Sequence, residues 1–262
     1  MAENDGSTPT LTASGPVAMV RLSRPRQMNK LTPADLATLM QHLAAVEPDP
    51  AVRVLILTAE GRAFSAGYDL GDIAARTART SESTPEDEKA SAFEEVVDRL
   101  ENLAVPTICR LNGGVYGGAT DLALSCDFRI GVDTCEMFMP AARLGLHYYK
   151  SGIVRFVSRL GVGAAKKLFL TAQKLDAAEM VRIGYLDAAV PADQLDAEVN
   201  KLAAILAANA PIAMRGMKQA INEFARQHFD AAGAELRYRN SLAGPEIREG
   251  AAAFAEKRSP RF

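Results

Sequence analysis

The feature that most constrains the fold of this chain is a continuous apolar run, VRVLILTA, at residues 52–59. A strand that is hydrophobic on both faces belongs in a sheet that is covered on both sides, as parallel sheets are. Further strand patterns lie at residues 17–22, in PTICRLNGG and in DFRIGVD, and helical or turn patterns separate them. This alternation of strand and helix predicts an α/β fold.

The second half of the chain is helical in pattern from residue 152 onward. Asp176 is placed to cap a helix and Gly184 to end it. More helices are predicted near residues 193–209, 211–227 and 230–242. We expect a disordered lead-in at 1–15, a core at 16–200 and a helical region at 201–262, with a mobile loop at 76–88, where Ser, Thr, Glu and Asp are frequent.

Composition excludes several functional classes. With 30 basic and 32 acidic residues the net charge is −2, so nothing indicates a nucleic acid or an anionic membrane as partner. No apolar run approaches the roughly 20 residues of a membrane span, and the N-terminus does not resemble a signal peptide. Cys109, Cys126 and Cys135 form neither a CxxC pair nor a zinc-type spacing. We therefore expect reduced thiols, no bound metal and a cytoplasmic location.

Two glycine-containing segments each follow a predicted strand, FSAGYDL at 64–70 and GGVYGGA at 113–119. Ligands of open α/β sheets bind at the carboxyl ends of strands, and small residues leave backbone N–H groups unobstructed, as an oxyanion hole requires. Each segment alone is more typical of a tight turn, whereas the pair favours a site. Neither has a phosphate-binding pattern, so nucleotide hydrolysis and hydride transfer are not expected.

Asp121 and the segment LGLHYYKSG leave alternatives open. Asp121 lies about one turn into a helix that begins near Gly118. Its carboxylate either interacts with the helix N-terminus, which is worth about 0.3–1 kcal/mol, or faces a substrate. The polar and aromatic residues 147–150 lie in a loop before a helix, where they either cover the core or belong to the site.

Several segments together resemble the enoyl-CoA hydratase/isomerase, or crotonase, superfamily: FSAGYDL, LNGGVYGGATDLALSCD, LTAQKLDAAEMVRIGYLDAAV and EGAAAFAEKRSPRF. The similarity runs from about residue 16 to the end. It implies a crotonase-like spiral core of ββα units with a C-terminal helical trimerisation region, and hence a homotrimer or a dimer of trimers. It also implies an acyl-CoA substrate and no cofactor beyond the CoA moiety of that substrate.

The resemblance also implies the site residues. The thioester oxygen would lie between the backbone N–H groups of Tyr68 and Gly118, and one such donor can be worth about 3 kcal/mol. Phe254 and Lys257 would complete the nucleotide site of a neighbouring subunit. The substrate-binding residues are then Arg26, Met28, Ser65, Ala66, Gly67, Tyr68, Asp69, Leu70, Gly117, Gly118, Phe254 and Lys257.

The sequence departs from the family pattern at one carboxylate. Family hydratases use two glutamates for proton transfer. The first aligns with Asp121 and the second with Ala141, which transfers no proton. Hydration of a 2-enoyl-CoA with Asp121 as a catalytic residue is the first expectation. Tyr148 and GGVYGGA are also similar to methylmalonyl-CoA decarboxylase, so decarboxylation is an alternative, with Tyr148 catalytic. A non-catalytic acyl-CoA-binding protein is the alternative from another class.

Overall fold

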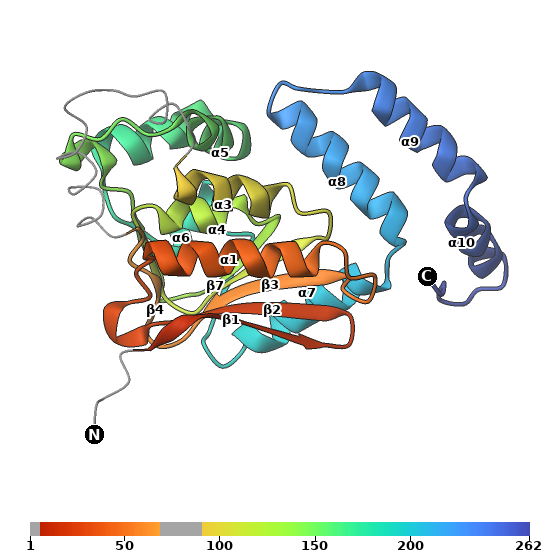
Figure 1. Ribbon diagram of the computed structural model, residues 1–262, viewed down its shortest axis with the longest axis horizontal. Coiled ribbons are helices and arrows are strands. Elements are labelled where there is room, and N and C mark those ends of the chain that lie inside the picture. Colours follow the sequence, from red (N-terminus) through yellow and green to blue (C-terminus); the bar gives the residue numbers. More distant parts are fainter. Residues whose placement is uncertain (1–5, 69–90) are drawn as a thin grey trace.

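A six-stranded sheet forms the centre of the molecule in the computed structural model, which describes residues 6–68 and 91–262 (Figure 1). The strand order is β1-β2-β3-β5-β7-β10, and every neighbouring pair is parallel except the β1–β2 hairpin. The strands are β1 (Ser7–Ser14), β2 (Val17–Ser23), β3 (Val54–Ala59), β5 (Thr107–Leu111), β7 (Phe128–Val132) and β10 (Ala188–Val190). The predicted α/β fold is confirmed.

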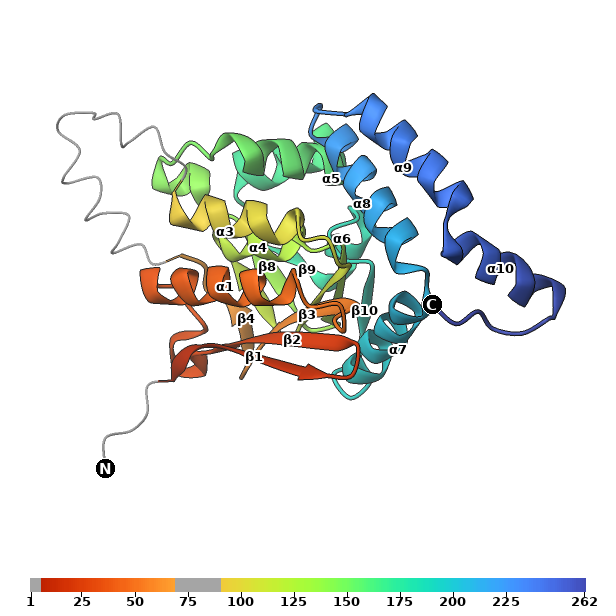
Figure 2. The ribbon, with the colours of Figure 1, turned by 45° about the vertical axis from the view of Figure 1, so that its right-hand side comes forward.

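Strand β3 explains the continuous apolar run in the sequence, because all six of its residues are buried. Helix α1 (Pro33–Val46) covers one side of the sheet and α7 (Leu195–Ala208) the other (Figure 2). Helix α7 contacts β3, β5 and β7. Burial on both faces is therefore what selects hydrophobic side chains at every position of β3.

A smaller sheet, of order β4-β6-β8-β9, brings the two glycine segments together. Its strands are β4 (Ala63–Ser65), β6 (Gly114–Tyr116), β8 (Glu136–Phe138) and β9 (Leu175–Asp176). Strands β3, β5 and β7 are each followed within a few residues by β4, β6 and β8. Because β4 and β6 pair in parallel, FSAGYDL and GGVYGGA end at the same edge. The helices α3 (Ala92–Glu101), α4 (Ala119–Ser125) and α5 (Lys150–Thr171) follow β4, β6 and β8 along the chain.

The helical second half agrees with the sequence pattern. Asp176 caps α6 (Ala177–Arg182) by accepting a hydrogen bond from the Glu179 N–H at 2.8 Å, and Gly184 follows with a φ of 76°. The three later predicted helices are α7, α8 (Pro211–Ala225) and α9 (Ala231–Ala243), and α10 (Pro245–Ala255) follows them. Helices α8, α9 and α10 extend from the body of the molecule as a C-terminal arm (Figure 1).

Two of the predicted boundaries are wrong. Residues 7–14 are not a disordered lead-in but strand β1, which pairs with β2 from Ser7↔Ser23 to Ser14↔Val17. The predicted boundary between residues 200 and 201 falls inside α7, which packs on the central sheet. The helical region that stands apart from the sheet therefore begins with α8.

The remaining global expectations concern cysteines, membranes and a loop. Cys109, Cys126 and Cys135 are free and buried, as predicted. Within the described residues, no helix has both the length and the apolar character to cross a bilayer. The loop predicted at 76–88 lies outside the described residues.

Candidate active site

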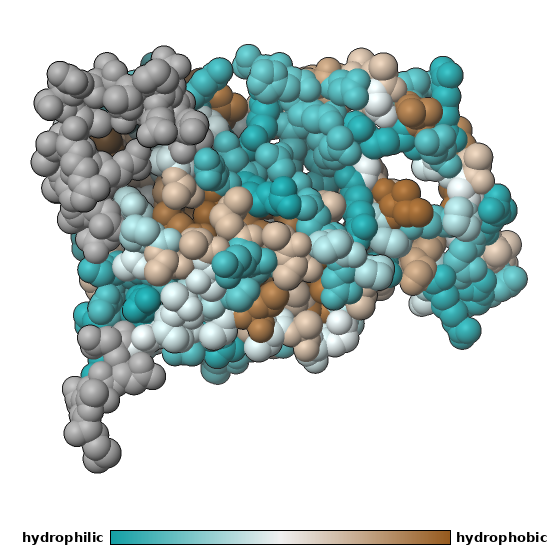
Figure 3. Space-filling model, viewed as in Figure 1, coloured by the Kyte–Doolittle hydropathy of each residue, from teal (hydrophilic) through white to brown (hydrophobic). Residues whose placement is uncertain are grey.

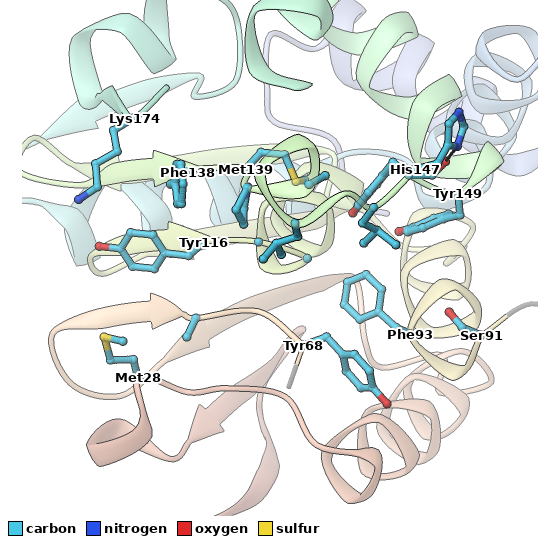
Figure 4. A pocket seen from close by; sticks show the side chains of 18 of the residues that line it. Met28, Tyr68, Ser91, Phe93, Tyr116, Phe138, Met139, His147, Tyr149 and Lys174 are labelled. Atoms are coloured by element: carbon cyan, nitrogen blue, oxygen red, sulfur yellow. Dashed lines mark hydrogen bonds between the residues drawn. The ribbon is translucent and has the colours of Figure 1, made fainter. Parts of the chain in front are cut away.

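A cavity of about 830 Å³ lies between the ends of β4 and β6 on one side and the loop before α5 on the other (Figure 4). Aromatic rings form much of its wall. Phe93, His147 and Tyr149 lie toward one end, and Tyr116 and Lys174 lie toward the other. A cavity of this size and apolar character is typical of sites for small organic ligands.

The two glycine segments meet at this cavity, as the sequence predicted. Gly67 has a φ of 91°, and a Cβ there would lie 2.6 Å from the Tyr116 carbonyl oxygen and 2.9 Å from the Gly118 nitrogen. Only glycine permits this approach of two backbones. Gly118 is the N-cap of α4, so its N–H is one of the donors that a helix leaves without an intrahelical partner. Tyr68 and Gly118 both line the cavity.

The turn around Met28 holds the first glycine segment in place. The Ala66 N–H donates to the Met28 carbonyl at 2.7 Å. Ser65 is fully buried; its hydroxyl donates to the Asn29 carbonyl at 2.7 Å and accepts from the Gly67 N–H at 3.1 Å. Met28 and Ala66 line the cavity, as does Gly117 in the second segment, whereas Ser65 supports the turn from behind.

Asp121 lies behind the cavity wall and is fully buried. Arg155 Nη1 donates to Asp121 Oδ1 at 2.6 Å, and Tyr148 Oη donates to Oδ2 at 3.3 Å. The Tyr149 hydroxyl also donates to Oδ2. Asp121 lies in the first turn of α4, as one of the two alternatives from the sequence has it. Its carboxylate does not line the cavity, so direct contact with a substrate stays a prediction.

Tyr148 and Tyr149 separate Asp121 from the cavity. Their rings stack with centroids 4.5 Å apart, and the Tyr149 ring meets Phe93 edge-on at 6.3 Å (Figure 4). Both tyrosines line the cavity, with Tyr148 buried and Tyr149 half-buried. Burial and the neighbouring Asp121 charge raise the pKa of each phenol far above its ordinary value. Both hydroxyls thus stay protonated at neutral pH.

Arg155 connects Asp121 to a buried charge cluster that the sequence analysis missed. Its guanidinium is fully buried and lies 2.5 Å from Asp98, 3.1 Å from Glu101 and 2.6 Å from Asp121. Burial is the largest single influence and disfavours the charged guanidinium, but Asp121, Tyr149 and Asp98 together outweigh it and raise the pKa of Arg155. We name the buried charge cluster after its buried members, Glu101, Asp121 and Arg155; the half-buried Asp98, Arg159 and Arg226 complete it.

Two sequence signals could have located this cluster. Arg155 interrupts the apolar stretch GIVRFV, and a charged residue in such a stretch indicates a buried partner. Gly152, one turn earlier, allows α5 to approach α4, because a Cβ there would lie 2.4 Å from the Tyr148 ring and 2.8 Å from Asp121 Oδ2. Neither signal identifies Asp121 as the partner.

Other predicted site residues lie in different surroundings. Ala141 begins the 3-10 helix η2 (Ala141–Leu144) and lines the cavity, where it offers no carboxylate. Arg26, in the 3-10 helix η1 (Pro25–Gln27), is exposed and does not line the cavity. Phe254, in α10, and Lys257, just after it, are exposed and do not line the cavity of their own chain. Asp69 and Leu70 lie outside the described residues.

A carboxylate does line the cavity, at Glu136, but it is already paired. It accepts a hydrogen bond from Tyr116 Oη at 3.0 Å and contacts Lys174 Nζ at 2.8 Å. Lys174 and Tyr116 lower the pKa of Glu136, and both lie at the end opposite Tyr149 (Figure 4). Across residues 6–68 and 91–262, no three His, Cys, Asp or Glu side chains are grouped to hold a metal ion.

Comparison with known proteins shows the family to which the chain belongs. The family described as enoyl-CoA hydratase/isomerase matches residues 12–262. The crotonyl-CoA hydratase of Syntrophomonas wolfei is 32% identical over 252 residues, 94% of each chain. The short-chain-enoyl-CoA hydratase of Clostridium acetobutylicum is 31% identical over 95% of this chain and 94% of that protein. The crystal structure of an enoyl-CoA hydratase from Bacillus anthracis superposes with a TM-score of 0.86 and 30% identity, covering 98% of this chain and 99% of the other.

Proposed function

Because the chain belongs to the enoyl-CoA hydratase/isomerase family, we propose that its cavity binds an acyl-CoA thioester and stabilises the enolate of that thioester. The observation that carries this proposal is the approach of Gly67 to Gly118, which sets two backbone segments side by side at the cavity wall. The thioester oxygen accepts hydrogen bonds from the Tyr68 and Gly118 N–H groups. Loss of one such donor costs about 3 kcal/mol of transition-state stabilisation.

Hydration of a 2-enoyl-CoA is the first candidate reaction, because the names of two relatives state a hydratase activity. Hydration takes one proton from water and adds one to the α-carbon. Ala141 transfers none, and Asp121 reaches the cavity only through the tyrosine hydroxyls bonded to it. We therefore propose that Asp121 accepts and returns protons through the tyrosine hydroxyls and does not contact the substrate itself.

Decarboxylation of a malonyl-type thioester is the second candidate, favoured by the absence of an unpaired carboxylate among the described residues that line the cavity. The bond from the α-carbon to the carboxylate breaks and carbon dioxide leaves. The electron pair of that broken bond forms the enolate. The two amides would stabilise that enolate without a base. Tyr148 and Tyr149 are the hydroxyls nearest to Asp121 at this end of the cavity.

Mass spectrometry of purified protein incubated with crotonyl-CoA and with methylmalonyl-CoA separates these candidates. A 3-hydroxyacyl-CoA product supports hydration, and propionyl-CoA with released carbon dioxide supports decarboxylation. Saturable binding of both esters without turnover would instead support a non-catalytic acyl-CoA-binding protein. If neither ester binds, the proposed site is wrong.

We also propose a homotrimer or a dimer of trimers, in which Phe254 and Lys257 reach the CoA bound by a neighbouring subunit. The support is the C-terminal arm, on which hydrophobic side chains are exposed (Figure 3). The free buried thiols are in keeping with a cytoplasmic location.

A further inference from the structure

We propose that the Tyr149 hydroxyl relays protons between the substrate and Asp121. This relay rests on the acyl-CoA site proposed above. It identifies Tyr149 as the residue of that site that transfers the proton. Tyr149 was part of the polar cluster noted in the sequence, but nothing in the sequence distinguished it from its neighbours.

The geometry places Tyr149 between the cavity and the carboxylate. Its ring lines the cavity and is half-buried, whereas Asp121 is fully buried and does not line it. The Tyr149 hydroxyl donates to Asp121 Oδ2, and Tyr148 Oη makes a longer bond of 3.3 Å to the same oxygen. Tyr149 thus lines the cavity with its side chain and lies one hydrogen bond from Asp121.

A phenol can conduct a proton because it donates one hydrogen bond and accepts others. Tyr149 Oη accepts a proton from a bound water or from the substrate α-carbon as its own proton passes to Asp121 Oδ2. In hydration the electron pair of the broken water O–H bond forms the new C–O bond at the β-carbon, and the C=C π pair moves onto the thioester oxygen as the enolate. When the α-carbon is the donor, the electron pair of its broken C–H bond forms the enolate directly. Tyr149 is neutral before and after, Asp121 becomes a neutral acid, and the reverse steps return the proton.

The buried charge cluster lets Asp121 change its charge. Arg155 keeps two carboxylate partners, Asp98 at 2.5 Å and Glu101 at 3.1 Å, when Asp121 is protonated. The guanidinium is therefore never left without a counter-charge in a buried position, which would be costly. A concerted transfer also avoids a buried Tyr149 phenolate next to the Asp121 carboxylate, which burial and like charge both disfavour.

Deuterium exchange at the α-carbon of butyryl-CoA tests the relay without assuming a particular overall reaction. The full-length protein is incubated with butyryl-CoA in D₂O, label is followed by mass spectrometry, and binding is measured separately by calorimetry. We expect Tyr149→Phe to lower the exchange rate by about 100-fold, at the lower end of general acid–base contributions, with Kd unchanged. Thr12→Val, which removes a hydroxyl at an exposed position of β1 that neither lines the cavity nor belongs to the C-terminal arm, is the control and should exchange like the wild type.

Asp121→Asn separates the relay from direct action of the carboxylate. The relay predicts that Asp121→Asn and Tyr149→Phe lose exchange to a similar extent. Wild-type exchange in Tyr149→Phe, or binding without exchange by the wild type, overturns the relay and leaves the proposed binding site standing. Absence of binding by the wild type overturns the proposed function and the relay with it.

The Tm of Tyr149→Phe shows whether this variant folds. If it does not fold, a measurement on the wild type tests the relay instead. The exchange rate is measured in mixtures of H₂O and D₂O. In the relay the Tyr149 hydroxyl proton moves as the α-carbon–hydrogen bond breaks, and it is the solvent-exchangeable proton in flight, so the rate falls linearly as the deuterium fraction rises. A rate that does not depend on the deuterium fraction contradicts the relay.

Discussion

At the scale of single residues, Gly67 is the position where an added side chain would most disturb the proposed amide pair. Its φ of 91° strains any other residue, and a Cβ would lie 2.6 Å from the Tyr116 oxygen and 2.9 Å from the Gly118 nitrogen. We expect Gly67→Ala to lower the free energy of unfolding by about 1–3 kcal/mol. Because the amides would also move apart, kcat/KM on the acyl-CoA substrate should fall by about 100-fold. Urea denaturation and initial rates measure both effects.

Gly163→Ala is the control for this prediction. No heavy atom lies within 4 Å of a Cβ built at Gly163, which is inside α5 and has no positive φ. Alanine favours a helix over glycine by about 0.5–1 kcal/mol, so we expect a small gain in stability and unchanged turnover. Equal losses in the two variants would show that the close approach at Gly67 is not what matters.

Ala141 provides a gain-of-function test at the same scale. Ala141 lines the cavity, and the resemblance drawn from the sequence implies the second glutamate of family hydratases at this position. If hydration is limited by the missing group, Ala141→Glu should raise the hydration rate of crotonyl-CoA by about 100-fold, as a general acid or base can. Ala141→Gln has nearly the same shape and cannot transfer the proton, so it should show no gain. Equal rates in the Glu and Gln variants would contradict the assignment.

At the scale of elements, the buried charge cluster joins α3, α4, α5 and α8. Arg155 of α5 contacts Asp98 and Glu101 of α3 and Asp121 of α4, and Arg226, the C-cap of α8, contacts Asp98 at 3.4 Å. Removing one partner from a buried ion pair leaves uncompensated charge. We therefore expect Arg155→Met to lower the free energy of unfolding by about 3–5 kcal/mol, measured by guanidinium denaturation.

Arg239→Met is the matched control for Arg155→Met. Arg239 forms an exposed ion pair with Glu235 in α9, with side chains 73% and 53% exposed. Such pairs contribute about 0.3–0.5 kcal/mol, so the variant should stay close to the wild type. A loss for Arg155→Met as small as this would mean that the buried charges contribute no more than surface charges do.

The helices and strands also show how much of the fold could be predicted from the sequence. β3 and the helices from α7 to α9 follow from apolar runs and periodicity, and the meeting of FSAGYDL with GGVYGGA follows from two consecutive strand ends. Strand β1 could not be predicted in this way, because Pro9 is its one buried residue and a single buried position gives no apolar pattern. The strand forms through its pairing with β2. The contact of Arg155 with Asp121 spans 34 positions and depends on the packing of α5 against α4, which no local pattern encodes.

At the scale of the whole molecule, the C-terminal arm exposes a large apolar surface in the single chain. No residue of α8 or α9 is buried, and hydrophobic side chains are exposed on the arm (Figure 3). Exposed apolar surface of this extent indicates a protein interface. The large exposed hydrophobic residues of the arm are Ile212, Met217, Ile221, Phe224, Phe229, Leu236, Tyr238, Leu242, Ile247 and Phe254.

We expect light scattering of the purified protein to give three or six times the chain mass of 28.0 kDa. The double variant Ile221→Glu, Phe224→Glu places two charges on α8 where side chains are 66% and 72% exposed, and it should dissociate the assembly. Ile205→Glu puts the same charge at a 53% exposed position of α7 and should leave the assembly intact. Wild-type protein that elutes with the mass of one chain would contradict the proposed oligomer.

Assembly should also control CoA affinity. If Phe254 and Lys257 complete the site of a neighbouring subunit, the dissociated variant lacks a stacking ring and a cation at each site although its own cavity is unchanged. A Phe254→Ala, Lys257→Ala variant, which alters no residue of α8 or α9, should then remain assembled and lose CoA affinity to the same extent. Calorimetry with CoA measures both. Phe254 is 88% exposed in its own chain, so the proposal has it contact a CoA bound by a neighbouring subunit. Wild-type CoA affinity in the Phe254→Ala, Lys257→Ala variant would show that the nucleotide binds elsewhere.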